Sequence, residues 1–133
     1  MTYLKAFIAG LTFPATVFPL VLLALWSAGK IAILEILPIY LAPLIWGVWN
    51  VLYFAVGKRC PVKNQNLRLW VTGAVLGFLL ALCVVFVFKA PSVLFGITGY
   101  LQYVPLAMIT IIYSILWRYV VKYFNSLLGL KDW

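Results

Sequence analysis

Few residues of this sequence could carry acid–base or ion-binding chemistry. Only Glu35 and Asp132 are acidic among its 133 residues, and histidine is absent. Catalytic and metal sites usually combine paired carboxylates, histidines or clustered thiolates. The two cysteines, Cys60 and Cys83, lie far apart in the sequence and form no such cluster. We therefore expect no enzymatic activity, no metal site and no cofactor.

Glu35 is the one acidic residue within the apolar part of the sequence, a turn into its second apolar segment. A lone carboxylate near a bilayer is either held at the interface by a cation such as Lys30, or it binds a proton or a cation. Gln102 begins the last apolar segment and is expected at a similar depth. Glu35, Gln102 and Tyr40 are therefore the candidates for lining a polar cavity.

Prolines could shape such a cavity by bending the helices around it. Each proline removes one backbone hydrogen bond and pushes away the carbonyl one turn back, so a kink is expected. The expected kink positions are Pro14, Pro19, Pro38, Pro43 and Pro105. Pro19 and Pro43 lie at similar depth counted outward from Lys30, and matching kinks could expose carbonyls to a small polar cavity. The alternative is that the prolines only shape helix packing.

Asn50 is the polar residue expected deepest in the second apolar segment. An amide in hydrocarbon needs a hydrogen-bond partner, which another helix commonly supplies. Trp46, Asn50 and Tyr53 are spaced i, i+4 and i+7, so they share one helix face. That face either contacts a neighbouring helix, which we prefer, or lines a pocket for an amphipathic molecule.

A second packing signal lies in the third apolar segment, where Gly73, Gly77 and Ala81 recur every four residues. Small residues at this interval let another helix approach closely. The spacing predicts a helix-packing seam, and its partner is either a helix of the same chain or one of another subunit.

The composition indicates the surroundings of these residues. Hydrophobic residues make up 67% of the sequence and charged residues 9%, whereas soluble domains are about one-quarter charged. Four apolar segments are each long enough to cross about 30 Å of hydrocarbon as a helix. We expect an all-α polytopic membrane protein, a four-transmembrane-helix bundle forming one integral membrane domain. The predicted parts are spans at 3–28, 32–56, 69–88 and 100–123, a loop at 57–68 and an interfacial C-terminal tail at 124–133.

The distribution of positive charge predicts the orientation. Eight of the ten Lys and Arg residues lie near the termini or in the loop 57–68, and only Lys30 and Lys89 lie on the other side. Because Lys and Arg concentrate on the cytoplasmic side of membranes, both termini and this loop are expected in the cytoplasm, with the chain in a bacterial cytoplasmic membrane. The cations form no continuous stripe, so no nucleic-acid partner is expected. Those expected to contact anionic lipids are Lys58, Arg59, Lys63, Arg68, Arg118 and Lys122.

Two functions are compatible with these features. The first is a non-catalytic accessory or assembly subunit that binds a larger membrane complex, or a second copy of itself, through its helix faces. The packing seam, the basic face and the lack of self-sufficient chemistry favour it. The alternative is an oligomeric small transporter or a lipid- or amphipath-binding protein, with a polar cavity near Glu35 between proline-kinked helices.

Overall fold

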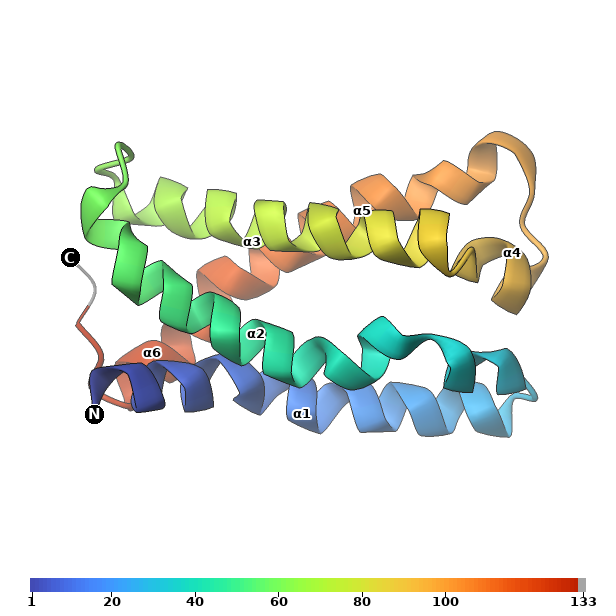
Figure 1. Cartoon of the computed structure of the whole chain (residues 1–133), viewed down its shortest axis with the longest axis horizontal. Coiled ribbons are helices and arrows are strands. Elements are labelled where there is room, and N and C mark those ends of the chain that lie inside the picture. Colours follow the sequence, from blue (N-terminus) through green and yellow to red (C-terminus); the bar gives the residue numbers. More distant parts are fainter. Residues whose placement is uncertain (132–133) are drawn as a thin grey trace.

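The computed structural model describes residues 1–131, except the side chain of Lys58, and every element in that part of the chain is a helix (Figure 1). Four helical segments are long and apolar enough to cross a membrane, as predicted, which indicates a multi-pass membrane protein. These segments are Thr2–Ser27, Leu37–Val56, Gln65–Val87 and Gly99–Leu127. The orientation of the chain in a membrane stays a prediction.

The four segments are built from longer α-helices and shorter helical pieces. The α-helices are α1 (Thr2–Ser27), α2 (Leu37–Val56), α3 (Gln65–Leu82), α4 (Ala90–Phe95), α5 (Val104–Leu116) and α6 (Lys122–Leu127). The tighter 3₁₀ turns are η1 (Ile31–Glu35), η2 (Gly57–Arg59) and η4 (Gly99–Tyr103). The wider π turns are η3 (Cys83–Val87) and η5 (Trp117–Val121), which continue α3 and α5.

The helices form two packed pairs, α1 with α2 and α3 with α5 (Figure 1). The N terminus, residues 57–64 and the C-terminal segment gather at one end of the bundle, here called the loop end. The turn at 28–30 and α4 lie at the opposite end, the hairpin end. The last segment crosses the bundle obliquely, so that α6 comes to pack beside α1 at the loop end.

The central loop is shorter than predicted, because α3 begins at Gln65 rather than at Leu69. The Asn64 side chain accepts hydrogen bonds from the backbone N–H groups of Asn66 at 2.9 Å and Leu67 at 3.4 Å. Asparagine is a favoured N-cap because it satisfies the free donors of the first helical turn. Arg68 is therefore a residue of α3 and not of a loop.

Two of the expected proline kinks are wrong. Pro38 lies in the first turn of α2 and Pro105 in the first turn of α5, after the 3₁₀ turns η1 and η4. Proline is tolerated there because first-turn N–H groups have no partner within the helix. Pro14, Pro19 and Pro43 do lie inside their helices. The second α-helix thus starts at Leu37, later than the expected residue 32.

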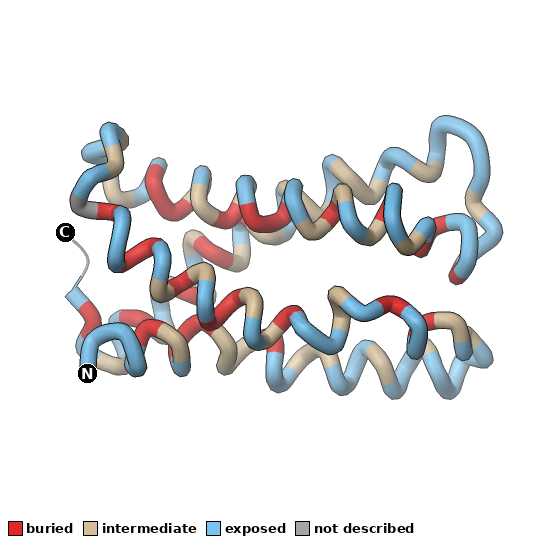
Figure 2. Tube along the Cα trace, in the orientation of Figure 1, coloured by how far each residue is buried: buried red, intermediate tan, exposed pale blue. Residues whose placement is uncertain are grey.

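Buried residues line the facing sides of the helix pairs (Figure 2). Many large apolar side chains are exposed on the outside. One core cluster, around Trp46 and Trp117, occupies the middle and the loop end of the bundle. A smaller cluster joins Ile33 and Ile36 to Ala90 and Leu94 of α4 at the hairpin end. Between 11% and 33% of the most apolar stretch of each span is buried. So large an exposed apolar surface suits lipid rather than water.

The predicted seam of small residues packs within this chain. A Cβ atom added to Gly73 would lie 2.5 Å from the Tyr113 carbonyl oxygen and the Trp117 Cβ, and one at Gly77 would lie 2.6 Å from the Tyr113 Cβ. Ala81 continues the seam and is fully buried. The sequence left the partner of this seam open, and in the structure the partner is the last helical segment of the same chain.

A second close approach, between α1 and α2, was missed in the sequence. A Cβ at Gly10 would lie 2.5 Å from the Trp46 carbonyl oxygen, and one at Gly47 would lie 2.7 Å from the Phe7 ring. Ala6 and Gly10 are small residues four apart, so the same spacing rule could have found this contact.

Gly73→Ala should destabilise the bundle by about 1–3 kcal/mol, although alanine favours a helix more than glycine does, because the added methyl group forces the α3 and α5 backbones apart. The thermal unfolding midpoint in detergent micelles, followed by circular dichroism, measures this loss. Ala107→Val adds methyl groups on the exposed face of α5 and is the matched control, expected to leave the midpoint unchanged. An equal loss in both variants would contradict the close approach.

Candidate functional site

The residues expected to line a polar cavity lie apart from the pockets of this structure. Glu35 and Tyr40 are exposed, and Gln102 is half-buried. None of the three lines the pockets described below. Glu35 ends the 3₁₀ turn η1 and is exposed, although its neighbours Ile33 and Ile36 pack against α4 at the hairpin end.

A cavity of about 210 Å³ does lie among the helices that carry internal prolines, but its lining is apolar. Its walls are Phe18, Pro38, Ile39, Ala42, Leu80, Val84, Ile109 and Tyr113. The Tyr113 hydroxyl is the only polar side-chain group in this lining. The lining at this position is therefore apolar and differs from the polar cavity considered for these helices.

Trp46, Asn50 and Tyr53 share one buried face of α2, and each has a different role. Trp46 is fully buried, with its ring centroid 5.1 Å from that of Tyr113 and 5.3 Å from that of Trp117. Aromatic pairs at these separations are favourable, and this cluster joins α2 to the last helical segment.

Asn50 forms the polar contact that the sequence led us to expect, and its partner is Asn125. The Asn50 Nδ2 donates to the Asn125 Oδ1 at 2.7 Å and to the Ala6 carbonyl at 2.7 Å, and Asn125 donates back to the Asn50 Oδ1 at 3.3 Å. This amide pair links α1, α2 and α6. The residue was missed because positions 124–133 were interpreted as an interfacial tail, yet Trp117, Val121 and Asn125 recur every four residues as one buried stripe.

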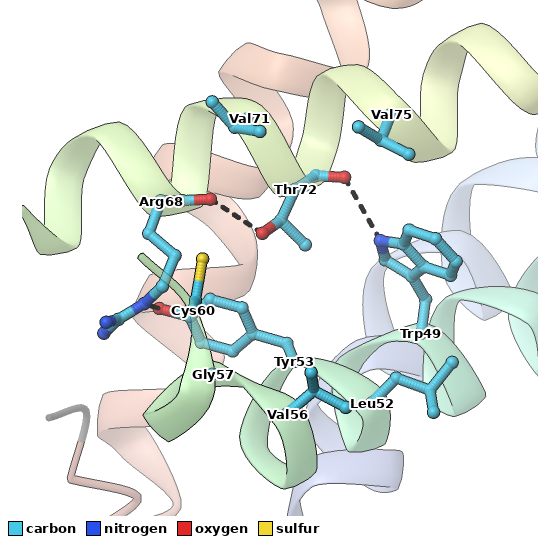
Figure 3. Close-up of a pocket in the computed structure, with 10 residues that line it drawn as sticks. All are labelled: Trp49, Leu52, Tyr53, Val56, Gly57, Cys60, Arg68, Val71, Thr72 and Val75. Atoms are coloured by element: carbon cyan, nitrogen blue, oxygen red, sulfur yellow. Dashed lines mark hydrogen bonds between the residues drawn. The ribbon is translucent and has the colours of Figure 1, made fainter. Parts of the chain in front are cut away.

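Tyr53 leads from the core to a groove of about 310 Å³ between α2 and α3 (Figure 3). Its lining is Trp49, Leu52, Tyr53, Val56, Gly57, Cys60, Arg68, Val71, Thr72 and Val75. Figure 3 shows Arg68, Cys60 and Gly57 at the loop end of the groove, and Trp49 and Val75 at its deeper end. From Arg68 to Val75 the groove follows α3 for about 10 Å, at about 1.5 Å per residue.

Hydrogen bonds hold the walls of the groove in place. The Trp49 Nε1–H donates to the Thr72 carbonyl at 3.1 Å, which joins α2 to α3 at the deeper end. The Thr72 hydroxyl donates to the Arg68 carbonyl at 2.7 Å. The groove therefore has a defined width, set by an indole on one helix and a carbonyl on the other.

The sequence predicted that Arg68 extends to the surface and contacts lipid headgroups. In the structure its side chain is buried instead. Its side chain is only 5% exposed, and its guanidinium carbon lies 5.6 Å from the centroid of the Tyr53 ring. The Arg68 Nε donates to the Tyr53 hydroxyl at 3.4 Å. The reason is that Arg68, next to the buried Leu69, lies on the side of α3 that faces Tyr53 of α2.

The other cations behave more nearly as surface charges. Arg59 and Lys63 are exposed at the loop end, and Arg118 and Lys122 are half-exposed on the last helical segment. The Arg118 guanidinium lies 5.2 Å from the centroid of the Tyr119 ring. The side chain of Lys58 lies outside the described part of the chain.

Comparison with known proteins adds no candidate: no protein-family model, curated protein or solved structure matches this chain. Among the described residues there is also no group of three or more His, Cys, Asp or Glu side chains that could hold a metal ion. The groove between α2 and α3, with Arg68 and Tyr53 at one end, is the candidate site.

Replacing Asn50 and Asn125 with alanine, singly and together, should reveal a coupling of about 1 kcal/mol between them, the usual size for a hydrogen bond inside a membrane protein. Each single variant should lose more than half of the unfolding free energy that the double variant loses, because it leaves the other buried amide without its partner. Unfolding in mixed micelles of increasing sodium dodecyl sulfate content measures the energies. The control is a second double-mutant cycle that combines Asn125→Ala with Asn66→Ala, since Asn66 is exposed. A coupling energy in this cycle as large as that between Asn50 and Asn125 would contradict the Asn50–Asn125 contact.

Proposed function

We propose that this chain is a non-catalytic, multi-pass membrane protein that holds an amphipathic molecule of the bilayer in the groove between α2 and α3. The observation that carries the proposal is the pairing, in one groove, of apolar walls with a guanidinium and a phenol at one end. Binding sites for amphipathic molecules combine these two features, since the walls cover the apolar part and a few polar groups orient the rest.

The apolar walls are oriented toward the bilayer. Val71 and Val75 on α3 and Leu52 on α2 are 44–45% exposed, although they line the groove. A molecule entering from the surrounding lipid would reach them without any rearrangement of the helices. Its apolar part would gain contacts with the side chains of both walls.

The architecture also supports a gap at this place. α2 and α3 belong to different helix pairs and touch only sparsely, whereas α1 packs along α2 and α3 along α5. Neither α2 nor α3 presents a glycine to the other across the groove. Gly47 faces α1 and Gly73 faces the last helical segment, within the two helix pairs. A small molecule is a natural filler of the space that remains.

Several polar residues of the described spans are engaged in structural hydrogen bonds, which supports a non-catalytic role. Asn50 and Asn125 bind each other, and the hydroxyls of Thr12, Thr16 and Thr110 donate to carbonyls of their own helices. Such bonds satisfy hydroxyl groups inside a helix and leave no activated nucleophile or base.

An accessory or assembly subunit is the function that the sequence favoured, and it stays a prediction. One of its three supports was the seam of Gly73, Gly77 and Ala81. Gly73 and Gly77 contact the last helical segment of the same chain and therefore offer no surface to a partner. A transporter that uses Glu35 also stays a prediction. Its support is weaker than before, because Glu35 is exposed and the cavity between the proline-bearing helices has an apolar lining.

Filling the groove should remove its ligand. In Val75→Trp the indole would occupy the deeper end, so a lipid that stays bound to the wild-type protein after gentle release from micelles should be lost. Native mass spectrometry counts the lipids on each molecule. Ile111→Trp places the same indole on the exposed face of α5 and should keep the wild-type count. Equal lipid counts in wild type and Val75→Trp would refute the proposal.

We also propose that the loop end faces the cytoplasm and that the membrane is the bacterial cytoplasmic membrane, in line with the eight cations at that end. Cys60 is half-exposed there, and Cys83 can be replaced to leave it as the only thiol. In Cys83→Ser, a membrane-impermeant maleimide should label Cys60 in inverted vesicles and not in spheroplasts.

The control for this orientation moves the thiol to the other end of the bundle. A Cys60→Ser, Cys83→Ser, Lys89→Cys variant carries it at an exposed position of the hairpin end and should label only in spheroplasts. The reverse pattern, or labelling of both variants from both sides, would overturn the orientation.

A further inference from the structure

The hydrophobic core of this bundle consists of two separate parts. The larger cluster is built around Trp46 and Trp117, and the smaller cluster joins Ile33 of η1 to Leu94 of α4 at the hairpin end. A domain usually has one contiguous core with small satellites. Here the two clusters have no buried residue in common, and the apolar cavity of about 210 Å³ has walls that belong to both.

Side chains from each side of the interruption form these walls. Leu80 and Tyr113 line the cavity and pack against the larger cluster. Ile39 and Val84 line it and pack against the smaller cluster. The cavity therefore lies between the clusters, and the side chains around it lack partner atoms on one side. An apolar molecule in the cavity would supply these contacts and join the two clusters into one core.

This cavity is more enclosed than the groove between α2 and α3. None of its lining residues is exposed, whereas Leu52, Val71 and Val75 of the groove are 44–45% exposed. All four helical segments contribute to its walls, from Phe18 on α1 to Tyr113 on α5. This enclosure favours a small, complete molecule over the chain of a bilayer lipid, whose headgroup stays at the membrane surface.

The lining also determines the chemistry of the occupant. It contains no charged side chain, so a charged ligand would lose its hydration without compensation. The Tyr113 hydroxyl is its one polar side-chain group, whereas a buried water needs about two to four polar partners. An engineered apolar cavity of about 150 Å³ binds benzene, so a cavity of about 210 Å³ has room for a ring with a short substituent. A hydroxyl both donates and accepts, so it can pair with one neutral polar group of the ligand.

We infer that this cavity is a second binding site, separate from the amphipath groove, and that it takes a small, neutral, monocyclic molecule with one hydroxyl or carbonyl group. The ring lies between the two clusters, and its polar group forms a hydrogen bond with the Tyr113 hydroxyl. The site depends on none of the polar residues of the groove, so it can exist whether or not the groove holds an amphipath.

The test uses 4-azidophenol, a photo-cross-linking probe of this class, on the purified full-length protein in detergent micelles. Peptide mass spectrometry should locate cross-links at lining residues such as Leu80 and Val84. An about tenfold excess of 4-ethylphenol should reduce these cross-links about tenfold, as mass action requires for ligands of similar affinity. Cross-links at exposed Ile111 come from probe dissolved in the micelle and should not fall. Absence of cross-links from the lining, or no reduction there by 4-ethylphenol, overturns the inference.

Variants that fill the cavity then assign the cross-links to it. Ala42 lines the cavity and is 2% exposed, so Ala42→Leu places an isopropyl group in the space of the ligand and should abolish the cross-links at the lining. Val84→Phe fills the same space from η3, so the test does not depend on the folding of one variant. Ala107→Leu makes the matched change on the exposed face of α5 and should keep the cross-links. Cross-links that persist at the lining in a folded cavity-filling variant would refute the site.

Tyr113→Phe tests the polar contact by itself. The concentration of 4-ethylphenol that halves the cross-links should rise about fivefold, the effect of one neutral hydrogen bond, because the ring stays and only the hydroxyl is lost. The concentration of ethylbenzene that halves them should not change. An equal rise for both competitors, or no rise for either, would contradict the role of the Tyr113 hydroxyl.

Two further arms separate this site from lipid binding and from the groove. Excess phosphatidylcholine should leave the cross-links at the lining in place, and their loss would show that the cavity holds a lipid chain instead. Val75→Trp, which blocks the groove, should also keep them. Their loss in Val75→Trp would show that the two sites are not separate. If Val75→Trp keeps both its lipid and these cross-links, the groove proposal fails and the cavity site stands.

Discussion

An amide buried among apolar helices must find hydrogen-bond partners or cost several kcal/mol, and in this protein that constraint falls on Asn50. Asn50 meets it with the Ala6 carbonyl and with Asn125, so three segments of the chain have to converge at one point. The contact with Ala6 fits the register in which Gly10 and Gly47 lie in the α1–α2 interface. The contact with Asn125 joins α2 to α6, which also packs beside α1.

The groove follows from this arrangement. Because α5 packs on α3 through Gly73 and Gly77, and α6 packs at α1, the last segment joins the two helix pairs and leaves α2 and α3 only loosely apposed. The Trp49–Thr72 and Tyr53–Arg68 hydrogen bonds bridge them at the two ends of the groove, and the space between these bonds is the groove itself. The hydrogen bonds of Asn50 and the close approach of α3 and α5 at Gly73 and Gly77 thus together leave the groove between α2 and α3. Neither sequence pattern predicts this groove by itself.

Much of the fold could be predicted from the sequence, and less of the candidate site. The apolar segments, the face of Trp46, Asn50 and Tyr53, and the small-residue seam are local patterns. The hypothesis of a site at Glu35 rests on the rarity of its residue type, and the structure places this exposed carboxylate at the hairpin end, away from the groove. Asn64 could have been predicted as a helix cap from its residue type, but it was assigned to a loop. Asn125 could have been predicted as buried from the four-residue spacing with Trp117 and Val121, but it was assigned to a tail.

The sequence by itself determined the number of apolar helices and the residues that had to be buried, because hydropathy and helical periodicity act over one segment at a time. Only the tertiary structure decided which segments pair, because a small residue shows that a helix can approach closely and not which helix does so. It also decided the position of Arg68. A cation twelve residues after Val56, the last residue of the second apolar helix, is easily assigned to a loop, but the Asn64 cap and the packing of α3 bring Arg68 beside Tyr53 in the wall of the groove.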